Sequence, residues 1–441
     1  MKHLRDMTRR CFNFVANCMN TIKRFGHSTF SSLKIWNYRL YFIGQAISLS
    51  GTWMQTIAQS WLVLKITGSG TALGLVTALQ FLPILLLGPL GGVMADRFPK
   101  RKVLFFTQSA SCVLALTLGA LVATDTVQLW MVDVLALMLG LVNAVDNPTR
   151  QTFVIEMVKK EQLGNAVALN STQVNAARVI GPAIAGVLIA TVGLAWCFAI
   201  NGISYIAVLI ALLMMRAKDL HPFPQVPRAK GQLREGFRYV GSNPLLRDTL
   251  IMMAIIGTLS YEFNVILPLS ARFTFQGDAR TYAALTSAMG LGSVIASLFT
   301  ANRKKRSPEI LIRAAFLFGM SMLLVAIAPN FIIALIAMVL VGAFSINVLT
   351  LGNVMLQLES TPEMRGRVMA LWAVAFLGST PIGGPIIGWI GEHAGPRWGL
   401  AVGGFAALFA AVFGKTRSGR SPVADEEVRE EIAGEESTKV V

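Results

Sequence analysis

The sequence predicts an all-α membrane protein with twelve spanning helices, and three observations support this fold class. Of the 441 residues, 54% are hydrophobic and only 14% are charged, whereas soluble domains contain about 25% charged residues. The apolar residues gather in long runs, and each run can cross about 30 Å of hydrocarbon as a helix. Most of the basic residues lie in the segments between these runs. A chain of this kind requires lipid as its solvent.

The apolar runs form two sets of six, separated by a polar connection that contains seven basic residues. This division predicts an N-terminal arm at 1–39, a six-helix bundle at 40–215, a linker at 216–247, a second bundle at 248–414 and an acidic tail at 415–441. In chain order, the spans are expected near 40–65, 71–94, 103–123, 128–147, 166–191, 196–215, 248–271, 281–300, 309–328, 330–352, 367–391 and 398–414.

The basic residues predict that both termini face the cytoplasm, because cytoplasmic loops carry an excess of lysine and arginine. In this orientation the bases of segment 91–102, of the linker and of the run at 303–306 are cytoplasmic, and so is Arg150. The first 38 residues lack the apolar core of a signal peptide. A multi-pass protein of the inner cell membrane is therefore expected. The opposite loops keep only the bases Lys65, Arg272, Arg280 and Arg397.

The sequence indicates no enzyme, no cofactor and no metal site. Four cysteines and four histidines show no paired ligand spacing. The segment 414–416 resembles the end of a phosphate-binding loop, but Phe409 replaces the first glycine and a membrane helix precedes it. The net charge of +16 is spread between spans and does not form the basic patch of a nucleic-acid-binding domain.

The two halves repeat a glycine–proline pattern at an offset of 203 residues. Small residues let membrane helices approach closely, and parallel six-helix halves are typical of transporters that bind substrate near the midplane. The repeat therefore predicts helix-packing positions in spans five and eleven. These positions are Gly181, Pro182 and Gly186 in the first half and Gly384, Pro385 and Gly388 in the second.

The segment 91–102 reads Gly-Gly-Val-Met-Ala-Asp-Arg-Phe-Pro-Lys-Arg-Lys between two apolar runs. It resembles the loop between spans two and three of the major facilitator superfamily, whose pattern is Gly-x-x-x-Asp-Arg-x-x-Arg-Arg/Lys. Segments 44–55, 143–151, 170–178 and 267–269 extend the resemblance over nearly all of 36–415. They are most similar to the drug:proton antiporter branch, that of enterobactin exporters and macrolide efflux proteins.

This resemblance implies the major facilitator fold, with two six-helix bundles that alternate in access to the two sides of the lipid bilayer. It implies a multidrug-resistance-type efflux protein, a monomer, that exports a small bulky or amphipathic molecule, drug- or siderophore-like, in exchange for protons. A lipid or lysolipid flippase and a nutrient importer of the same fold remain alternatives. The direction of net flux and of proton movement would separate them.

The resemblance also assigns a gating role to the loop after span two. Asp96 would contact the N-terminus of span eleven, where an anion meets unsatisfied backbone N–H groups, while the cytoplasmic side is closed. Arg101, Arg365 and Arg367 are its candidate partners. Two features depart from the family pattern, because span four lacks a buried arginine and the loop 303–308 lacks an aspartate. The gating residues are Gly88, Gly92, Asp96, Arg97, Arg101 and Lys102.

Three ionisable residues are expected within the membrane, where a charge usually faces the bundle interior and finds a partner. Asp133 and Arg178 are expected at equal depth, which allows a buried pair. Burial disfavours the ionised form of a carboxyl group, so Glu262 is a candidate proton carrier. An ion pair of Glu262 with Arg272 or Arg280 is the alternative.

Three glutamines of span one, Gln45, Gln55 and Gln59, lie mostly along one helical stripe. They are candidates for lining the substrate cavity with amide groups, and hydrogen bonds between helices are the alternative role.

Overall fold

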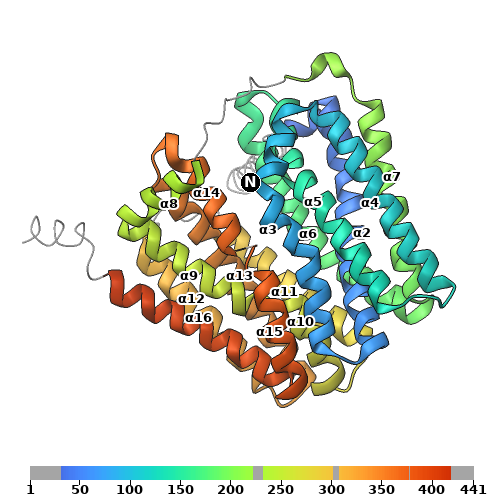
Figure 1. Ribbon diagram of the computed structural model, residues 1–441, viewed down its shortest axis with the longest axis vertical. Helices are drawn as coiled ribbons and strands as arrows, with labels where there is room; N and C mark the ends of the chain where they lie inside the picture. The colour runs from blue at the N-terminus through green and yellow to red at the C-terminus, as the bar shows by residue number, and fades with distance from the viewer. Residues whose placement is uncertain (1–30, 222–231, 301–306, 377, 419–441) are drawn as a thin grey trace, which may run out of the picture.

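The computed structural model describes residues 31–221, 232–300, 307–376 and 378–418, and within these ranges it contains helices and no strand. This architecture confirms the expected all-α class (Figure 1). The helices are α2 (Trp36–Thr67), α3 (Gly70–Arg97), α4 (Lys100–Ala123), α5 (Leu129–Met157), α6 (Lys160–Thr191), α7 (Leu194–Met214), α8 (Gln232–Ser242), α9 (Pro244–Ser260), α10 (Phe263–Leu269), α11 (Ala279–Thr300), α12 (Pro308–Ala326), α13 (Phe331–Leu358), α14 (Pro362–Phe376), α15 (Thr380–His393) and α16 (Pro396–Ser418), with short turns η1 (Ser31–Lys34), η2 (Ala217–Asp219) and η3 (Ser270–Thr274).

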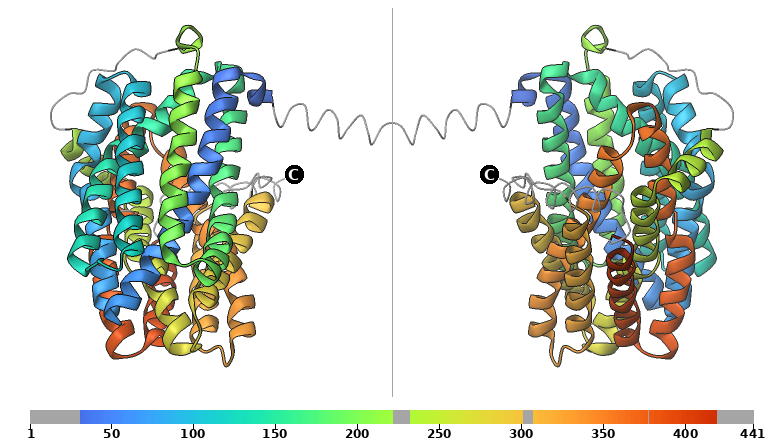
Figure 2. Two further views of the ribbon diagram at one scale, coloured as in Figure 1. Left: turned by 90° about the vertical axis from the view of Figure 1, so that its right-hand side faces the viewer. Right: turned by 90° about the vertical axis from the view of Figure 1, so that its left-hand side faces the viewer.

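The helices form two bundles that lie side by side, α2–α7 on one side and α9–α16 on the other (Figure 1). In the first bundle α2 packs against α6 and α7, and α3 packs against α5. In the second bundle α12 packs against α13 and α16, and α11 packs against α13. Views from two further sides show the helices running along the long axis of the molecule (Figure 2).

Eleven helical segments in the described ranges are long and apolar enough to cross a membrane. Two of them are interrupted, since α9, α10 and η3 make up one segment and α14 and α15 another. The first expected span, α2, has 32 residues and is therefore about 48 Å long, but it is not among the eleven. Its buried face carries polar side chains, including Gln45, Ser48 and Gln55, and these lower its hydropathy.

Two expected boundaries are wrong. Span four was expected to end at 147, but α5 continues through Pro148 to Met157, and α6 begins at Lys160. Proline interrupts soluble helices, whereas membrane helices tolerate it because neighbouring groups satisfy the freed backbone. The charged segment 91–102 is also mostly helical, because only Phe98 and Pro99 separate α3 from α4.

The helices have two sets of ends, for which we use two names. The basic end holds the α3–α4 and α5–α6 connections and the linker, and the far end holds the connections at 68–69, 192–193, 275–278 and 394–395. The far end lies at the bottom of Figure 1. This distinction matters because the contacts that join the two bundles gather towards the far end.

Candidate functional site

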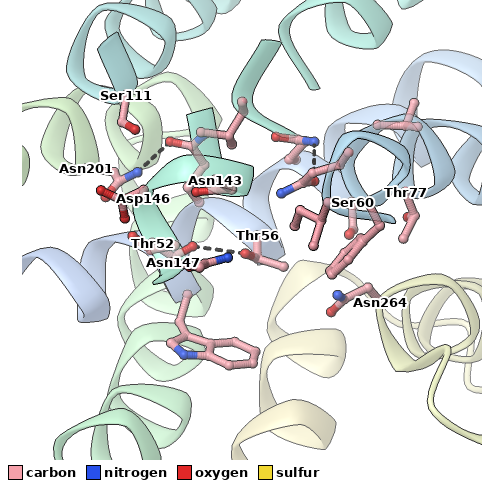
Figure 3. A pocket seen from close by; sticks show the side chains of 18 of the residues that line it. Thr52, Thr56, Ser60, Thr77, Ser111, Asn143, Asp146, Asn147, Asn201 and Asn264 are labelled. Carbon is pink, nitrogen blue, oxygen red and sulfur yellow. Dashed lines mark hydrogen bonds between the residues drawn. The ribbon is translucent and has the colours of Figure 1, made fainter. Parts of the chain in front are cut away.

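A cavity of about 310 Å³ lies among α2, α3, α4, α5 and α7. Of its lining residues, only Asn264 comes from the second bundle (Figure 3). Gln55 and Gln59 line the cavity, whereas Gln45 is not among the lining residues. The polar lining side chains are Thr52, Gln55, Thr56, Gln59, Ser60, Thr77, Gln80, Gln108, Ser111, Asn143, Asp146, Asn147, Arg150, Asn201, Tyr205 and Asn264. The cavity wall is thus rich in both hydrogen-bond donors and hydrogen-bond acceptors.

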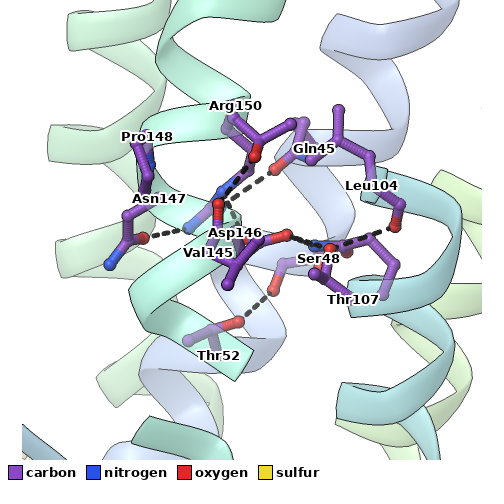
Figure 4. A network of polar contacts seen from close by, with 12 residues as sticks. Gln45, Ser48, Thr52, Leu104, Thr107, Val145, Asp146, Asn147, Pro148 and Arg150 are labelled. Atoms are coloured by element: carbon purple, nitrogen blue, oxygen red, sulfur yellow. Dashed lines mark hydrogen bonds and ion pairs between the residues drawn. The ribbon is translucent and has the colours of Figure 1, made fainter. Parts of the chain in front are cut away.

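One ion pair lies in the wall of this cavity. The Nε of Arg150 is 2.7 Å from the Oδ2 of Asp146, one helical turn earlier on α5. The other carboxylate oxygen of Asp146 accepts hydrogen bonds from Thr107 Oγ1 at 2.6 Å and from Gln108 Nε2 at 2.9 Å (Figure 4). Arg150 also donates to Gln45 Oε1 at 3.4 Å. The carboxylate is buried and held on every side, while 26% of the arginine side chain remains exposed.

A fourth span that ends at 147 places Arg150 in a cytoplasmic loop, whereas α5 continues to Met157 and carries Arg150 into the cavity wall. The expectation that span four lacks an arginine inside the bundle is therefore wrong. The signal was present in the spacing, since an acid and a base four residues apart lie on the same face of a helix. Within the proline-containing turn, Thr149 Oγ1 donates to the Val145 carbonyl at 2.6 Å.

The expected pair of Asp133 and Arg178 does not form. Asp133 lies four residues from the start of α5 at the far end, whereas Arg178 lies eighteen residues from the start of α6 at the basic end. A span that ends at 147 gives the two residues equal depth, whereas the observed end of α5 at Met157 places Asp133 farther from the basic end. Asp133 Oδ1 and Arg178 Nε are both buried without a hydrogen-bond partner. The guanidinium of Arg178 instead lies 5.1 Å from the ring centroid of Trp53.

Glu262 lies at the break between α9 and α10 and is 3% exposed. Its Oε1 is buried without a hydrogen-bond partner. The carboxyl packs against α15, where a Cβ added at Gly383 would lie 3.0 Å from Oε1 and one at Gly384 would lie 3.5 Å from Oε2.

Neither of the arginines considered as partners of Glu262 contacts it in the described part of the chain. Arg272 donates to the Leu64 carbonyl at the end of α2, at 2.7 Å. The backbone nitrogen of Arg280 donates to the Asp278 carboxylate. Arg272 therefore joins the two bundles at the far end and leaves Glu262 without a counter-charge.

The expected gating residues are placed only in part. The surroundings of Gly92 and the side chain of Asp96 lie outside the described part of the chain, whereas the side chains of Arg97 and Lys102 are exposed. Arg101 donates to the Leu212 and Leu213 carbonyls at the end of α7. Gly88 makes no close helix contact, because a Cβ there would meet no atom within 4 Å.

Two other arginines were considered as partners of Asp96. Arg365 donates to the Gln357 carbonyl at 2.9 Å. Arg367 pairs with Glu235 of α8 at 2.9 Å. Both contacts lie within the second half of the chain.

The glycines of the repeated pattern lie at close helix contacts. Gly181 packs on α2, where an added Cβ would lie 2.5 Å from Trp53 Cβ, and Gly186 packs on α11, 2.8 Å from Ala283 Cβ. In the second bundle, an added Cβ at Gly384 would lie 3.1 Å from the Gly74 carbonyl oxygen. The contacts made by Gly186 and Gly384 join the two bundles.

The far end is also closed by a carboxylate. Gly388 backs onto the Gly70 backbone so closely that a Cβ there would collide. One turn later, Glu392 Oε2 accepts hydrogen bonds from Ser69 Oγ at 2.7 Å, Thr71 N at 2.9 Å and Thr71 Oγ1 at 2.6 Å. We call Glu392, Ser69 and Thr71 the far-end latch. It places an anion at the N-terminus of α3, where the helix dipole favours negative charge.

Comparison with known proteins agrees with this architecture. Residues 27–435 match the family described as transmembrane secretion effector. The chain is 26% identical to the staphyloferrin A transporter of Staphylococcus aureus (strain NCTC 8325 / PS 47) over 336 residues, covering 76% of this chain and 84% of the relative. It is also 26% identical to the enterobactin exporter EntS of Escherichia coli O1:K1 / APEC over 380 residues, covering 85% and 90%.

Solved structures share the fold at low sequence identity. A bacterial homologue of the human lysosomal transporter Spinster has a TM-score of 0.69 and 14% identity, with 87% of this chain and 96% of that chain covered. A D-xylose–proton symporter has a TM-score of 0.66 and 16% identity, with 85% and 97% covered. These likenesses confirm the major facilitator fold. On the match to its sequence model, the chain belongs to the transmembrane secretion effector family of the major facilitator superfamily.

Proposed function

We propose that the protein exports a small siderophore-like molecule from the cytoplasm in exchange for protons. The 26% identical relatives are a staphyloferrin A transporter and an enterobactin exporter, and the polar cavity suits a molecule with many hydrogen-bonding groups. In this proposal the basic end is cytoplasmic, as the distribution of lysine and arginine predicts. The described conformation, with its far-end contacts, is then the one that loads substrate from the cytoplasm.

The observation that carries the proton coupling is the position of Glu262. The carboxyl group is buried against Gly383 and Gly384, and Gly384 also contacts Gly74 of α3. An ionised carboxylate is disfavoured in such surroundings. Closure of the far end therefore favours a protonated Glu262, and ionisation favours separation of α15 from α3.

This linkage gives the order of events for exchange. When the far end is open, Glu262 takes a proton from outside, and the substrate leaves. The protonated group allows α15 to close on α3. The proton is then released towards the cavity, which Asn264 lines two residues further along the chain. Binding of substrate precedes the next opening. Asp146 and Arg150 neutralise each other within the cavity wall and hold its shape.

The proposal is tested with inside-out vesicles that carry the protein and have an acidic interior. Enterobactin, staphyloferrin A, macrolides and dyes are added in turn, and collapse of the pH gradient is followed with a fluorescent amine. We expect at least one compound to collapse the gradient, and Glu262→Gln to abolish the collapse. Glu161→Gln removes a carboxylate that is exposed on α6 and serves as the control.

Several outcomes would contradict the proposal. Collapse that survives in Glu262→Gln would remove this residue from the coupling. Transport of a labelled compound without any proton movement would favour a flippase. Uptake of substrate and protons in the same direction would favour an importer.

A further inference from the structure

Arg178 lies where the two bundles meet, near the middle of α6. Its backbone packs against α11, because a Cβ added at Gly290 would lie 3.0 Å from the Arg178 carbonyl oxygen. Ser287 of α11 donates to the neighbouring Val179 carbonyl at 3.4 Å. The side chain of Arg178 turns towards α2 and lies over Trp53, and Trp53 also lines the cavity. The guanidinium thus lies against a residue of the cavity wall, although Arg178 itself is not among the lining residues.

The positive charge of Arg178 has no carboxylate partner among the described residues. The ion pairs of the described chain involve Lys100, Arg150, Arg247 and Arg367. Arg178 Nε is buried and makes no hydrogen bond. Arg150, in contrast, has its charge balanced by Asp146. A cation in a membrane interior is costly and usually finds a partner, so the unpaired Arg178 requires an explanation.

The second bundle carries a cluster of aromatic rings around Tyr261, at the break between α9 and α10. The hydroxyl of Tyr261 is fixed by the Ser345 carbonyl, and its ring lies 4.7 Å from that of Phe376. Phe376 in turn stacks on Trp372, with centroids 5.7 Å apart. Trp372 Nε1 is a further buried donor without a partner.

We propose that Arg178 binds an acidic group of the transported molecule, and that the molecule carries this group on or beside a flat ring. The proposal rests on the proposed transport function and names the substrate class. A guanidinium forms strong, often bidentate, hydrogen bonds to an oxyanion such as a carboxylate or a phenolate. Trp53 lines the cavity and offers an aromatic surface for a ring beside that oxyanion. A bound anion supplies the charge that the protein itself does not place next to Arg178.

Direct binding to the purified full-length protein in lipid nanodiscs tests this inference without any ion gradient. The probes are 2-naphthoate and 2-naphthamide, which have nearly the same shape and differ in charge. We expect the acid to bind at least about tenfold more tightly than the amide. Arg178→Gln should weaken binding of the acid about tenfold and leave that of the amide unchanged, and Arg178→Lys should retain part of the preference.

Arg280→Gln is the matched control, because it removes an exposed arginine from the far end of α11 and should change neither affinity. Equal binding of acid and amide to the unaltered protein would overturn the inference, as would an equal loss of both in Arg178→Gln. If Arg178→Gln fails to fold, the acid–amide comparison in the unaltered protein and in Arg178→Lys still decides. Failure of proton exchange with a preserved acid preference would remove the coupling mechanism and leave this site intact.

Discussion

The far-end latch offers a direct test of how the closed conformation is held. Glu392→Ala removes three hydrogen bonds to one carboxylate oxygen, from Ser69 Oγ, Thr71 N and Thr71 Oγ1. It also removes an anion from the N-terminus of α3. The contact exists only while α15 lies against α3, so its whole free energy favours the conformation in which the far end is closed.

The size of the effect follows from the exposure of the latch. A neutral hydrogen bond contributes about 0.5–1.5 kcal/mol and one to a charged group about 1.5–3 kcal/mol, but exposed ionic contacts contribute only about 0–1 kcal/mol. The latch is exposed, and we therefore expect about 1–2 kcal/mol for the three bonds together. This corresponds to a shift of about 5- to 30-fold in the ratio of closed to open far end.

The assay is a spin-label distance measurement across the far end, between Ala123→Cys and Pro329→Cys in a background without the native cysteines. Both positions are exposed: Ala123 is the last residue of α4, and Pro329 lies in the connection between α12 and α13. Glu392→Ala should increase the long-distance population, and Glu392→Gln should do so less. The control Asp278→Asn removes a carboxylate whose hydrogen bonds stay within the second bundle. An unchanged distribution in Glu392→Ala, or an equal change in the control, would refute the reasoning.

Three further predictions follow from close contacts and buried polar groups. Gly388→Val should prevent far-end closure, because its Cβ would collide with Gly70; transport should be lost and the same labels should report an open far end. Asp146→Asn should lower stability by about 1–3 kcal/mol, since Arg150 loses its counter-charge, and adding Arg150→Gln should restore part of the melting temperature. Tyr38→Phe should cost about 1 kcal/mol, because a buried hydroxyl that donates to α6 is lost; thermal unfolding measures this.

Two of these changes have a counterpart elsewhere in the chain. Gly164→Ala places a Cβ where no atom lies within 4 Å and should leave transport intact. Tyr239→Phe removes a hydroxyl whose hydrogen bond is exposed and should cost less than Tyr38→Phe. Loss of transport in Gly164→Ala, or an equal loss of stability in the two tyrosine variants, would contradict the packing argument. A double variant of Asp146 and Arg150 that is less stable than Asp146→Asn would contradict the charge argument.

The sequence predicted the helices well and their polar chemistry less well. Long apolar runs determine where the helices lie, because a segment inside the membrane must hydrogen-bond its own backbone N–H and C=O groups, and a helix does so. The error at Pro148 had the largest consequence, since ending α5 there hid Arg150 and misplaced the depth of Asp133 relative to Arg178. A single sequence also does not reveal which face a side chain occupies. The contact of Glu262 with Gly383 and Gly384, and the latch at Glu392, depend on the crossing of α15 with its neighbours and appear only in three dimensions.

The polar lining of the cavity comes almost entirely from the first bundle, and this affects both substrate specificity and the movement of a bound ligand. Because nearly all of the hydrogen-bonding groups belong to α2–α7, a bound molecule can keep those bonds while the second bundle rotates past it. The ligand would then stay bound to the first bundle throughout the transition, while the second bundle moves relative to both. Substitutions that change substrate specificity should therefore lie in the first bundle. Exchanging the second bundle between relatives should alter the turnover rate more than the substrate specificity.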